Sequence, residues 1–258
     1  MAENTSVQTD SDDLPDLHKK SFLGHLEDLR STILWSLLFL LVGIVIAIPL
    51  APFLVEILSY PIETADLHEK ISLKVIHVGG PVLIAMKLIL WTGILLSIPF
   101  IVLTVARFVF PGLTKKEKTV AIRGATLAVL LFISGVIMGY VWTLPVALKV
   151  TISIGEWLKS PAEFWETSNY VSFVLRLLIA FGLAFQLPVV VLALGKLGII
   201  DSSQLRSKRR HVIVGLMIMA MFLTPSDPFT MVLMATPLIA LYEGCIWIIW
   251  AGERGEKS

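Results

Sequence analysis

Long apolar blocks alternate with shorter polar stretches along almost the whole chain. The blocks cover about residues 33–55, 81–108, 120–148, 170–197, 211–223 and 229–250, and only the fifth is short. A helix rises ~1.5 Å per residue, so about 20 residues cross a hydrocarbon core of ~30 Å. The pattern therefore predicts an all-α membrane protein with six transmembrane helices in one domain, residues 18–252.

Composition agrees with a membrane protein. Hydrophobic residues make up 56% of the 258 residues and charged residues 16%, whereas a soluble domain carries roughly a quarter charged residues. So few charged residues cannot cover the surface of a water-soluble domain of this size. The formal net charge of +1 gives no bulk attraction for nucleic acid.

The two ends of the chain are expected to lie outside the membrane domain, and two prolines fall within its first span. Residues 1–17 are acidic and carry no Lys or Arg, the reverse of a secretory signal peptide, so we expect a disordered, uncleaved tail. Residues 253–258 are expected to form a short cytoplasmic tail. Pro49 and Pro52 are expected to bend or end the first span.

Basic residues predict the orientation of the spans. Fifteen of the 21 Lys and Arg residues flank the N-terminus, the loops after the second and fourth blocks, and the C-terminus: Lys19, Lys20, Arg30, Arg107, Lys115, Lys116, Lys118, Arg123, Lys196, Arg206, Lys208, Arg209, Arg210, Arg254 and Lys257. The positive-inside rule then places both termini in the cytoplasm, in a multi-pass inner-membrane topology. Six spans fit this pattern if blocks five and six form a helical hairpin. The alternative is that they form one re-entrant pair, which would place the two termini on different sides of the membrane.

Two acidic positions lie on the predicted cytoplasmic side. Phe22, Leu23, Leu26 and Leu29 recur at helical spacing before the first span, which suggests a short amphipathic interfacial helix with Glu27, Asp28 and Arg30 on its polar face. Solvated surface charge is the ordinary interpretation of these residues, and also of Glu117 among its lysine neighbours. The alternative is that Asp28 and Glu117 converge on a ligand with two guanidinium groups, since each carboxylate can pair with an arginine in bidentate fashion.

Polar residues inside the predicted spans are further candidate functional residues. Glu243 lies mid-span and is a functional candidate because an ionised group in lipid is costly. Lys87 and Arg176 lie nearer the outer ends of their spans, where snorkelling explains them. Gln186 beside Pro188 could bond across helices or face a wet cavity. Gly135 and Gly139 match a close-packing spacing on the third span.

Signatures of catalysis are absent from the sequence. It contains no HExxH, no GxSxG and no phosphate-binding glycine loop, and its single cysteine, Cys245, has no partner for a disulfide or metal site. We therefore expect no enzyme activity, cofactor or metal.

Four stretches together resemble one family. They are residues 25–30 (HLEDLR), 108–113 (FVFPGL) leading to Glu117, 181–188 (FGLAFQLP) and 223–229 (LTPSDPF). In order and position between the spans they resemble TatC, the signal-peptide receptor of the twin-arginine translocase. The resemblance implies six helices in a concave cup, a cytoplasmic site for the paired arginines of signal peptides on folded cargo, and transport driven by the proton motive force. It also implies TatA-like and TatB-like single-span partners, and a homo-oligomer within a hetero-oligomeric complex.

The same resemblance assigns residues to roles. Asp28 and Glu117 match the two recognition acids, Arg30 plausibly orients them, and Phe108 and Pro111 match the loop residues. Gln186 matches a polar position facing the concave side and linked to partner contact, and Asp227 matches a periplasmic-side aspartate. Two departures matter: Asp28 is one methylene shorter than the usual Glu, and Gln186 cannot ionise where the family often has Glu.

Two other function classes remain open at this point. A small-solute secondary transporter would use Gln186, Glu243 and the mid-span prolines, although intramembrane charge is scarce and no repeat is evident. A membrane assembly scaffold would bind partner subunits and ignore arginine pairs.

Overall fold

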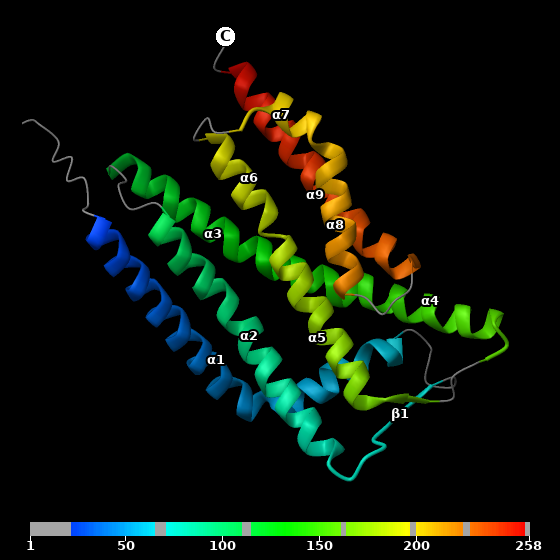
Figure 1. Cartoon of the computed structure of the whole chain (residues 1–258). Helices are drawn as coiled ribbons and strands as arrows, with labels where there is room; N and C mark the ends of the chain where they lie inside the picture. Colours follow the sequence, from blue (N-terminus) through cyan, green and yellow to red (C-terminus); the bar gives the residue numbers. More distant parts are fainter. Residues whose placement is uncertain are drawn as a thin grey trace, which may run out of the picture.

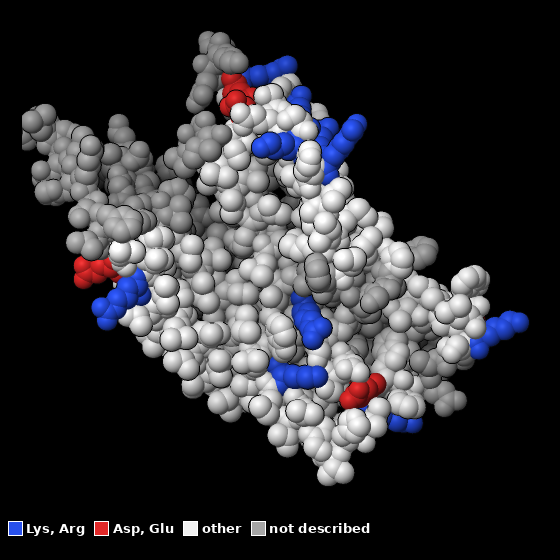
Figure 2. Space-filling model, in the orientation of Figure 1, with Lys and Arg blue, Asp and Glu red and all other residues white. Residues whose placement is uncertain are grey.

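The protein is an open assembly of helices. A computed structural model describes residues 22–64, 71–109, 115–160, 164–196, 200–223 and 228–255, so the predicted acidic tail lies outside the described residues. Figure 1 shows two arms, one of α1 and α2 and one of α7, α8 and α9, joined through α5, while Figure 2 shows a hollowed face between them. Helices suit this setting because lipid offers no hydrogen-bond partners for the backbone.

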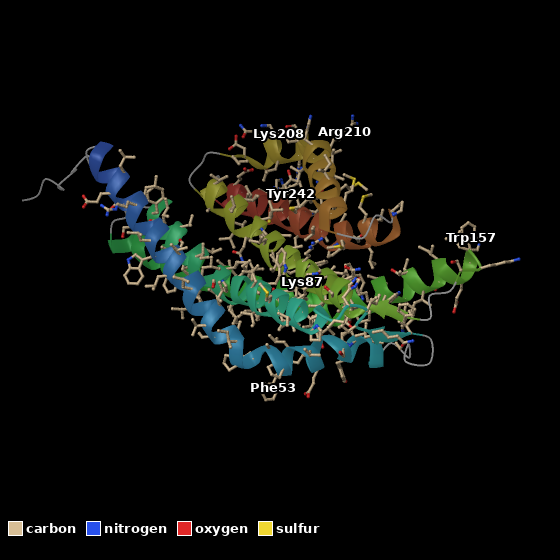
Figure 3. All side chains as sticks on the ribbon, turned by 60° about the horizontal axis from the view of Figure 1, so that its bottom comes forward. Phe53, Lys87, Trp157, Lys208, Arg210 and Tyr242 are labelled. Carbon is tan, nitrogen blue, oxygen red and sulfur yellow. The ribbon has the colours of Figure 1, made fainter. Side chains whose placement is uncertain are left out.

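Helix α1 (Phe22–Thr64) is longer than one membrane crossing. Its 43 residues would span about 65 Å at ~1.5 Å per residue, and the helix bends near Pro49 and Pro52, beside the labelled Phe53 (Figures 1 and 3). The prediction that these prolines bend the first span is confirmed. The amphipathic segment is not a separate helix, because α1 is continuous from Phe22 to Thr64.

The last turns of α1 are held by tyrosines from other helices. Pro61 has no N–H, so the carbonyl of Ile57 lacks its helical donor. The hydroxyl of Tyr140 donates to that carbonyl, and the hydroxyl of Tyr170 donates to the Leu58 carbonyl at 2.6 Å. These bonds attach the bent end of α1 to the centre of the fold.

Helix α2 (Gly80–Val109) packs along the first half of α1 at very short range. A Cβ on Gly93 would lie 2.8 Å from the Ile44 Cα, and one on Gly43 would lie 2.6 Å from the Gly93 carbonyl oxygen. The hydroxyl of Ser97 lies 2.9 Å from the Phe39 carbonyl oxygen, across the same contact. Small residues let two backbones approach in lipid, where apolar surface alone does not drive helix association.

A long helical rod crosses behind the centre of the molecule (Figure 1). It consists of α3 (Lys115–Met138), a π-helical turn η1 (Gly139–Thr143) and α4 (Leu144–Trp157). Pro145 lies at the start of α4, so the backbone must change its hydrogen-bond pattern there, and the wider π turn does this without ending the rod. The predicted third span ended at Leu148, whereas the helix continues to Trp157.

Helix α5 (Thr167–Ala184) is the most buried element. Val174, Leu175, Leu177 and Phe181 are all almost fully buried, and α5 packs against α2, α3 and α8. The expected close packing on the third span is confirmed, because a Cβ on Gly135 would lie 2.7 Å from the Phe181 carbonyl oxygen. A break at residues 185–186 precedes α6 (Leu187–Lys196), since Pro188 cannot continue the hydrogen-bond ladder of α5.

Two short strands and three helices complete the fold at opposite ends of the molecule. Strands β1 (Ser72–Lys74) and β2 (Phe164–Glu166) pair in parallel, a contact that the hydropathy pattern did not predict. At the other end, α7 (Ser202–Ser207), α8 (Arg209–Leu223) and α9 (Pro228–Gly255) form the second arm. Within the described residues, five helical stretches are long and apolar enough to cross a membrane. The 15 residues of α8 are fewer than those of any of these stretches, as its short block predicted.

We expect Gly93→Ala to lower thermal stability because the new methyl group would push α1 and α2 apart. Overpacking a tight contact costs about 1–3 kcal/mol, which corresponds to a fall of several degrees in the unfolding temperature of a protein this size. Gly215→Ala in α8 is the matched control, since a Cβ there has no neighbour within 4 Å. Equal unfolding temperatures for both variants in the same detergent would contradict the close approach of the two helices.

Candidate functional site

Asp28 and Arg30 lie on the first turns of α1. Asp28 is half-buried, and the hydroxyl of Thr32, one turn later, donates to its backbone carbonyl at 2.8 Å. Arg30 is exposed. The acid and the arginine therefore differ in their environment although only one residue separates them.

A shallow apolar groove of about 490 Å³ begins beside Asp28 and runs between α1 and α2. It is lined by Leu29, Thr32, Ile33, Ser36, Leu37, Leu40, Ile101, Val105 and Phe108. Its two hydroxyls donate to carbonyls of the preceding turn, from Thr32 to Asp28 and from Ser36 to Thr32, both at 2.8 Å. With these donors engaged, the groove presents an almost wholly apolar surface, and Asp28 directly precedes its first lining residue, Leu29.

Phe108 lies in the last turn of α2, and Glu117 lies near the start of α3. Phe108 lines the groove together with residues from the first turns of α1. Glu117 lies in the first turn of α3, at the same end of the molecule as the start of α1 (Figure 1), but its side chain is outside the described ones. Pro111 lies outside the described residues. The positive end of the α3 dipole favours a carboxylate at the position of Glu117.

Gln186 lies at the break between α5 and α6. Its amide Nε2 donates to the carbonyl of Ala128 on α3 at 2.9 Å, so it bonds across helices as one of the sequence alternatives proposed. Its Oε1 is buried and has no partner in the described part of the protein. One acceptor of this amide therefore stays unsatisfied among the described residues.

Glu243 pairs with a residue that the sequence analysis did not single out. Its carboxylate accepts from Arg209 at 2.6 Å, which links α9 to the first residue of α8. Nearby, the Tyr242 hydroxyl donates to the Leu205 carbonyl at 2.9 Å. The pair is only partly exposed, so its first effect is to hold the second arm together. Arg209 belongs to the basic run 206–210, but 34 residues separate the partners and only the fold joins them.

The remaining candidate residues lie away from the apolar groove or outside the described residues. Asp227 lies outside the described residues. Among the described side chains, no group of three or more His, Cys, Asp or Glu is placed to hold a metal ion. Lys87 donates to the Ser168 hydroxyl at 2.7 Å, and the Arg176 guanidinium lies 6.0 Å from the centre of the Trp91 ring.

Comparisons with known proteins agree with one another. The family model described as "Sec-independent protein translocase protein (TatC)" matches residues 24–237. The protein of that name from Deinococcus radiodurans is 34% identical over 233 residues, covering 89% of this chain and 85% of the relative. The one from Aquifex aeolicus is 34% identical over 234 residues, covering 91% and 96%.

Solved structures match as well. One described as "Crystal Structure of Twin Arginine Translocase Receptor- TatC" superposes with a TM-score of 0.78 at 34% identity. The match covers 88% of this chain and 98% of that one. It extends over both arms and the central helices.

We expect Glu243→Gln to weaken the second arm because Arg209 would lose its carboxylate partner. The pair is about a third exposed, so the loss is on the order of 1 kcal/mol, or a few degrees in the unfolding temperature. The exchange Arg209→Glu with Glu243→Arg should recover most of that loss. Failure of the exchange to recover any stability would mean that the ion pair does not join α8 to α9.

Proposed function

The chain belongs to the TatC family of Sec-independent protein translocase subunits, and on that premise we propose that Asp28 and Glu117 bind the paired arginines of signal peptides on folded cargo. The half-buried position of Asp28 beside the apolar groove is the observation that carries this proposal. Arg30, Phe108 and Pro111 complete the site, with the arginine orienting the acids and the other two shaping the loop.

Two carboxylates explain a preference for arginine over lysine. A guanidinium offers a planar fork that matches a carboxylate in two parallel hydrogen bonds, whereas an ammonium acts as a point charge. Asp28 is shorter than the glutamate usual at this position, so its arginine must approach α1 more closely or bind through a water. Of the two acids, Glu117 therefore contributes more to the affinity.

The groove provides a place for the apolar part of the same ligand. A signal peptide has a charged segment followed by about 7–15 apolar residues. With the arginine pair at Asp28, the next residues would lie along Leu29, Ile33 and Leu37 on α1 and Val105 on α2. Burial of apolar surface contributes roughly 25 cal/mol per Å², so the groove adds affinity that does not depend on the arginines.

The topology that this function requires has six spans and both termini in the cytoplasm of an inner-membrane protein. The distribution of basic residues supports that orientation. Helix α8 serves as the fifth of the six, although it has only 15 residues. A crossing of about 22 Å leaves the tip of the α8–α9 hairpin below the outer surface, where the bilayer thins or the flanking residues adapt.

Binding of cargo is one part of a larger assembly. Single-span TatA-like and TatB-like subunits dock on this chain, copies of which join in the same complex, and the proton motive force drives transport. Gln186, whose side chain is partly exposed at the break between α5 and α6, contributes to partner contact. Because an amide does not titrate, no step at this position depends on a carboxyl proton.

We expect Glu117→Ala and Asp28→Ala each to lower affinity for a signal peptide carrying Arg-Arg, with the larger loss at Glu117. Losing one partner of a buried charge pair costs about 2–5 kcal/mol and a rim pair far less. For a half-buried acid we expect about a tenfold loss, or ~1.4 kcal/mol. Binding is measured by fluorescence anisotropy with the purified protein in detergent.

The matched ligand control carries Lys-Lys, which should bind weakly to the wild type and be insensitive to Glu117→Ala. Glu27→Ala, on the exposed face of α1, is the matched protein control. Equal affinity for the two peptides would favour a scaffold without peptide recognition. Solute flux into liposomes that contain this protein alone would favour a transporter.

Filling the groove should weaken binding without touching the acids. Ser36→Trp places an indole between α1 and α2, and we expect at least a fivefold loss of affinity for the full signal peptide. A peptide truncated after the arginine pair should bind both proteins equally. Leu38→Trp, at an exposed position of α1 outside the groove, should leave both affinities unchanged. Equal affinity of the full peptide for wild type and Ser36→Trp would exclude the groove from the site.

A further inference from the structure

Two arginines from different helices share one aromatic ring at the end of the last membrane-spanning stretch. The guanidinium carbon of Arg254 lies 3.8 Å from the centre of the Trp250 ring, and that of Arg206 lies 5.7 Å from the same centre. Arg254 follows Trp250 by one turn on α9, whereas Arg206 belongs to α7. Both arginines are exposed and Trp250 is half-buried. The fold therefore gathers at one ring two positive charges that are far apart in the chain.

Hydrogen bonds between α7 and α9 fix this arrangement. The backbone N–H of Ser202 donates to the Glu253 carboxylate at 2.8 Å, and the Ser202 hydroxyl donates to the other oxygen of the same carboxylate. Farther along α7, the Leu205 carbonyl accepts from the Tyr242 hydroxyl of α9 at 2.9 Å. Arg206 directly follows Leu205, so the contacts between the two helices set its position beside the ring.

A guanidinium that stacks on a ring keeps its hydrogen-bond donors at its edge. The planar face makes the aromatic contact, while the five N–H groups lie in the plane and match the oxygens of a phosphate in parallel pairs. In the described part of the protein, neither guanidinium has a carboxylate within ion-pair distance. Because both groups lie beside one ring, a phosphate at the edge of that ring is close to both sets of donors.

The order of residues along α9 matches the order of groups in a phospholipid. Trp247, Trp250 and Arg254 follow one another on successive turns, and the two tryptophan rings meet edge to face with their centres 5.9 Å apart. The apolar stretch Met231–Arg254 is long enough to cross the membrane, so Trp247 lies on the membrane side of Arg254. Trp247 and its neighbour Ile248 are 62% and 58% exposed. Cation, interfacial ring and exposed apolar surface thus follow the order of phosphate, glycerol ester and acyl chain.

We propose that Arg206 and Arg254, held on Trp250, bind the phosphate of an anionic membrane lipid whose acyl chain lies along Trp247 and Ile248. Arginine stacked on an aromatic ring is suited to phosphate recognition, and basic sites at membrane-spanning helices can hold lipid headgroups. The bound lipid holds the end of the second arm at the membrane surface. This site is on the opposite arm from the apolar groove of α1 and α2, so the proposal does not depend on the proposed function (Figure 1).

The test is native mass spectrometry of the purified full chain in detergent with added lipids. Phosphatidylglycerol is the anionic probe and phosphatidylcholine, which also has a phosphate but no net charge, is the matched lipid. We expect the Kd of the first phosphatidylglycerol to be at least tenfold lower, or ~1.4 kcal/mol. Glycerol 3-phosphate, the headgroup chemistry without acyl chains, should not displace it at a tenfold excess. Displacement by glycerol 3-phosphate would overturn the lipid as ligand and assign the pair to free phosphates.

Substitutions separate a built site from general attraction to positive charge. The double variant Arg206→Gln with Arg254→Gln should abolish the preference for phosphatidylglycerol. Trp250→Leu keeps every charge but removes the ring, so we expect it to lose most of the preference, and Trp250→Phe should retain it. Lys208→Gln with Arg210→Gln is the matched control, because it removes two exposed cations from the same end of the molecule (Figures 2 and 3). An equal loss in this control would overturn the site.

An acidic residue of the chain itself is the competing occupant. Glu256 lies two positions after Arg254, outside the described residues. If Glu256→Gln lowers the Kd of phosphatidylglycerol tenfold or more, that carboxylate and not a lipid is the native partner of the arginines. Equal affinity of the wild type for the two lipids would also overturn the proposal.

Binding of the Arg-Arg signal peptide, measured for every variant, checks that each one is folded. The single change Arg254→Gln, at the last turn of α9, leaves α7 untouched and should still reduce the lipid preference if the double variant does not fold. A wild type that prefers phosphatidylglycerol but ignores the Arg-Arg peptide would keep the lipid site and contradict only the proposed function.

Discussion

The burial of α5 is the constraint on which the other helices depend. In lipid, apolar side chains gain nothing by leaving one hydrocarbon surface for another, so helices must be held by close packing and hydrogen bonds. Phe181 packs on the glycine face of the α3–η1 rod, and the Tyr170 hydroxyl holds the bent end of α1. With α5 in contact with α2, α3 and α8, the two arms keep their separation and the face between them stays hollow.

Charges inside the membrane divide into two kinds. Glu243 and Arg209 neutralise each other and join α8 to α9. Glu243 was a functional candidate because an ionised group in lipid is costly, and the ion pair gives it a structural role as well. Among the described residues, Lys87 and Arg176 contact neutral groups, the Ser168 hydroxyl and the Trp91 ring.

The proposed signal-peptide site would join two kinds of recognition in one place. Asp28 offers a carboxylate where the apolar groove begins, and Thr32 and Ser36 keep their hydroxyls on the backbone so that the groove stays apolar. A ligand with arginines followed by apolar residues fits both parts. This geometry also explains why α1 continues without interruption from Phe22, because a break after Arg30 would separate the acid from the groove.

Local properties of the chain were predictable from sequence: the apolar blocks, the bend at Pro49 and Pro52, the short α8, the close-packing glycines of the third span and the family itself. Each follows from residues near one another along the chain, where hydropathy, missing N–H groups and motif spacing act. Only the tertiary structure decided the contacts between distant residues: the pairing of β1 with β2, the ion pair of Glu243 with Arg209, the groove between α1 and α2, and the contact of Arg176 with Trp91. A charge in an apolar block has the same local sequence signal whether it is paired or open, because its energy depends on which helix lies beside it.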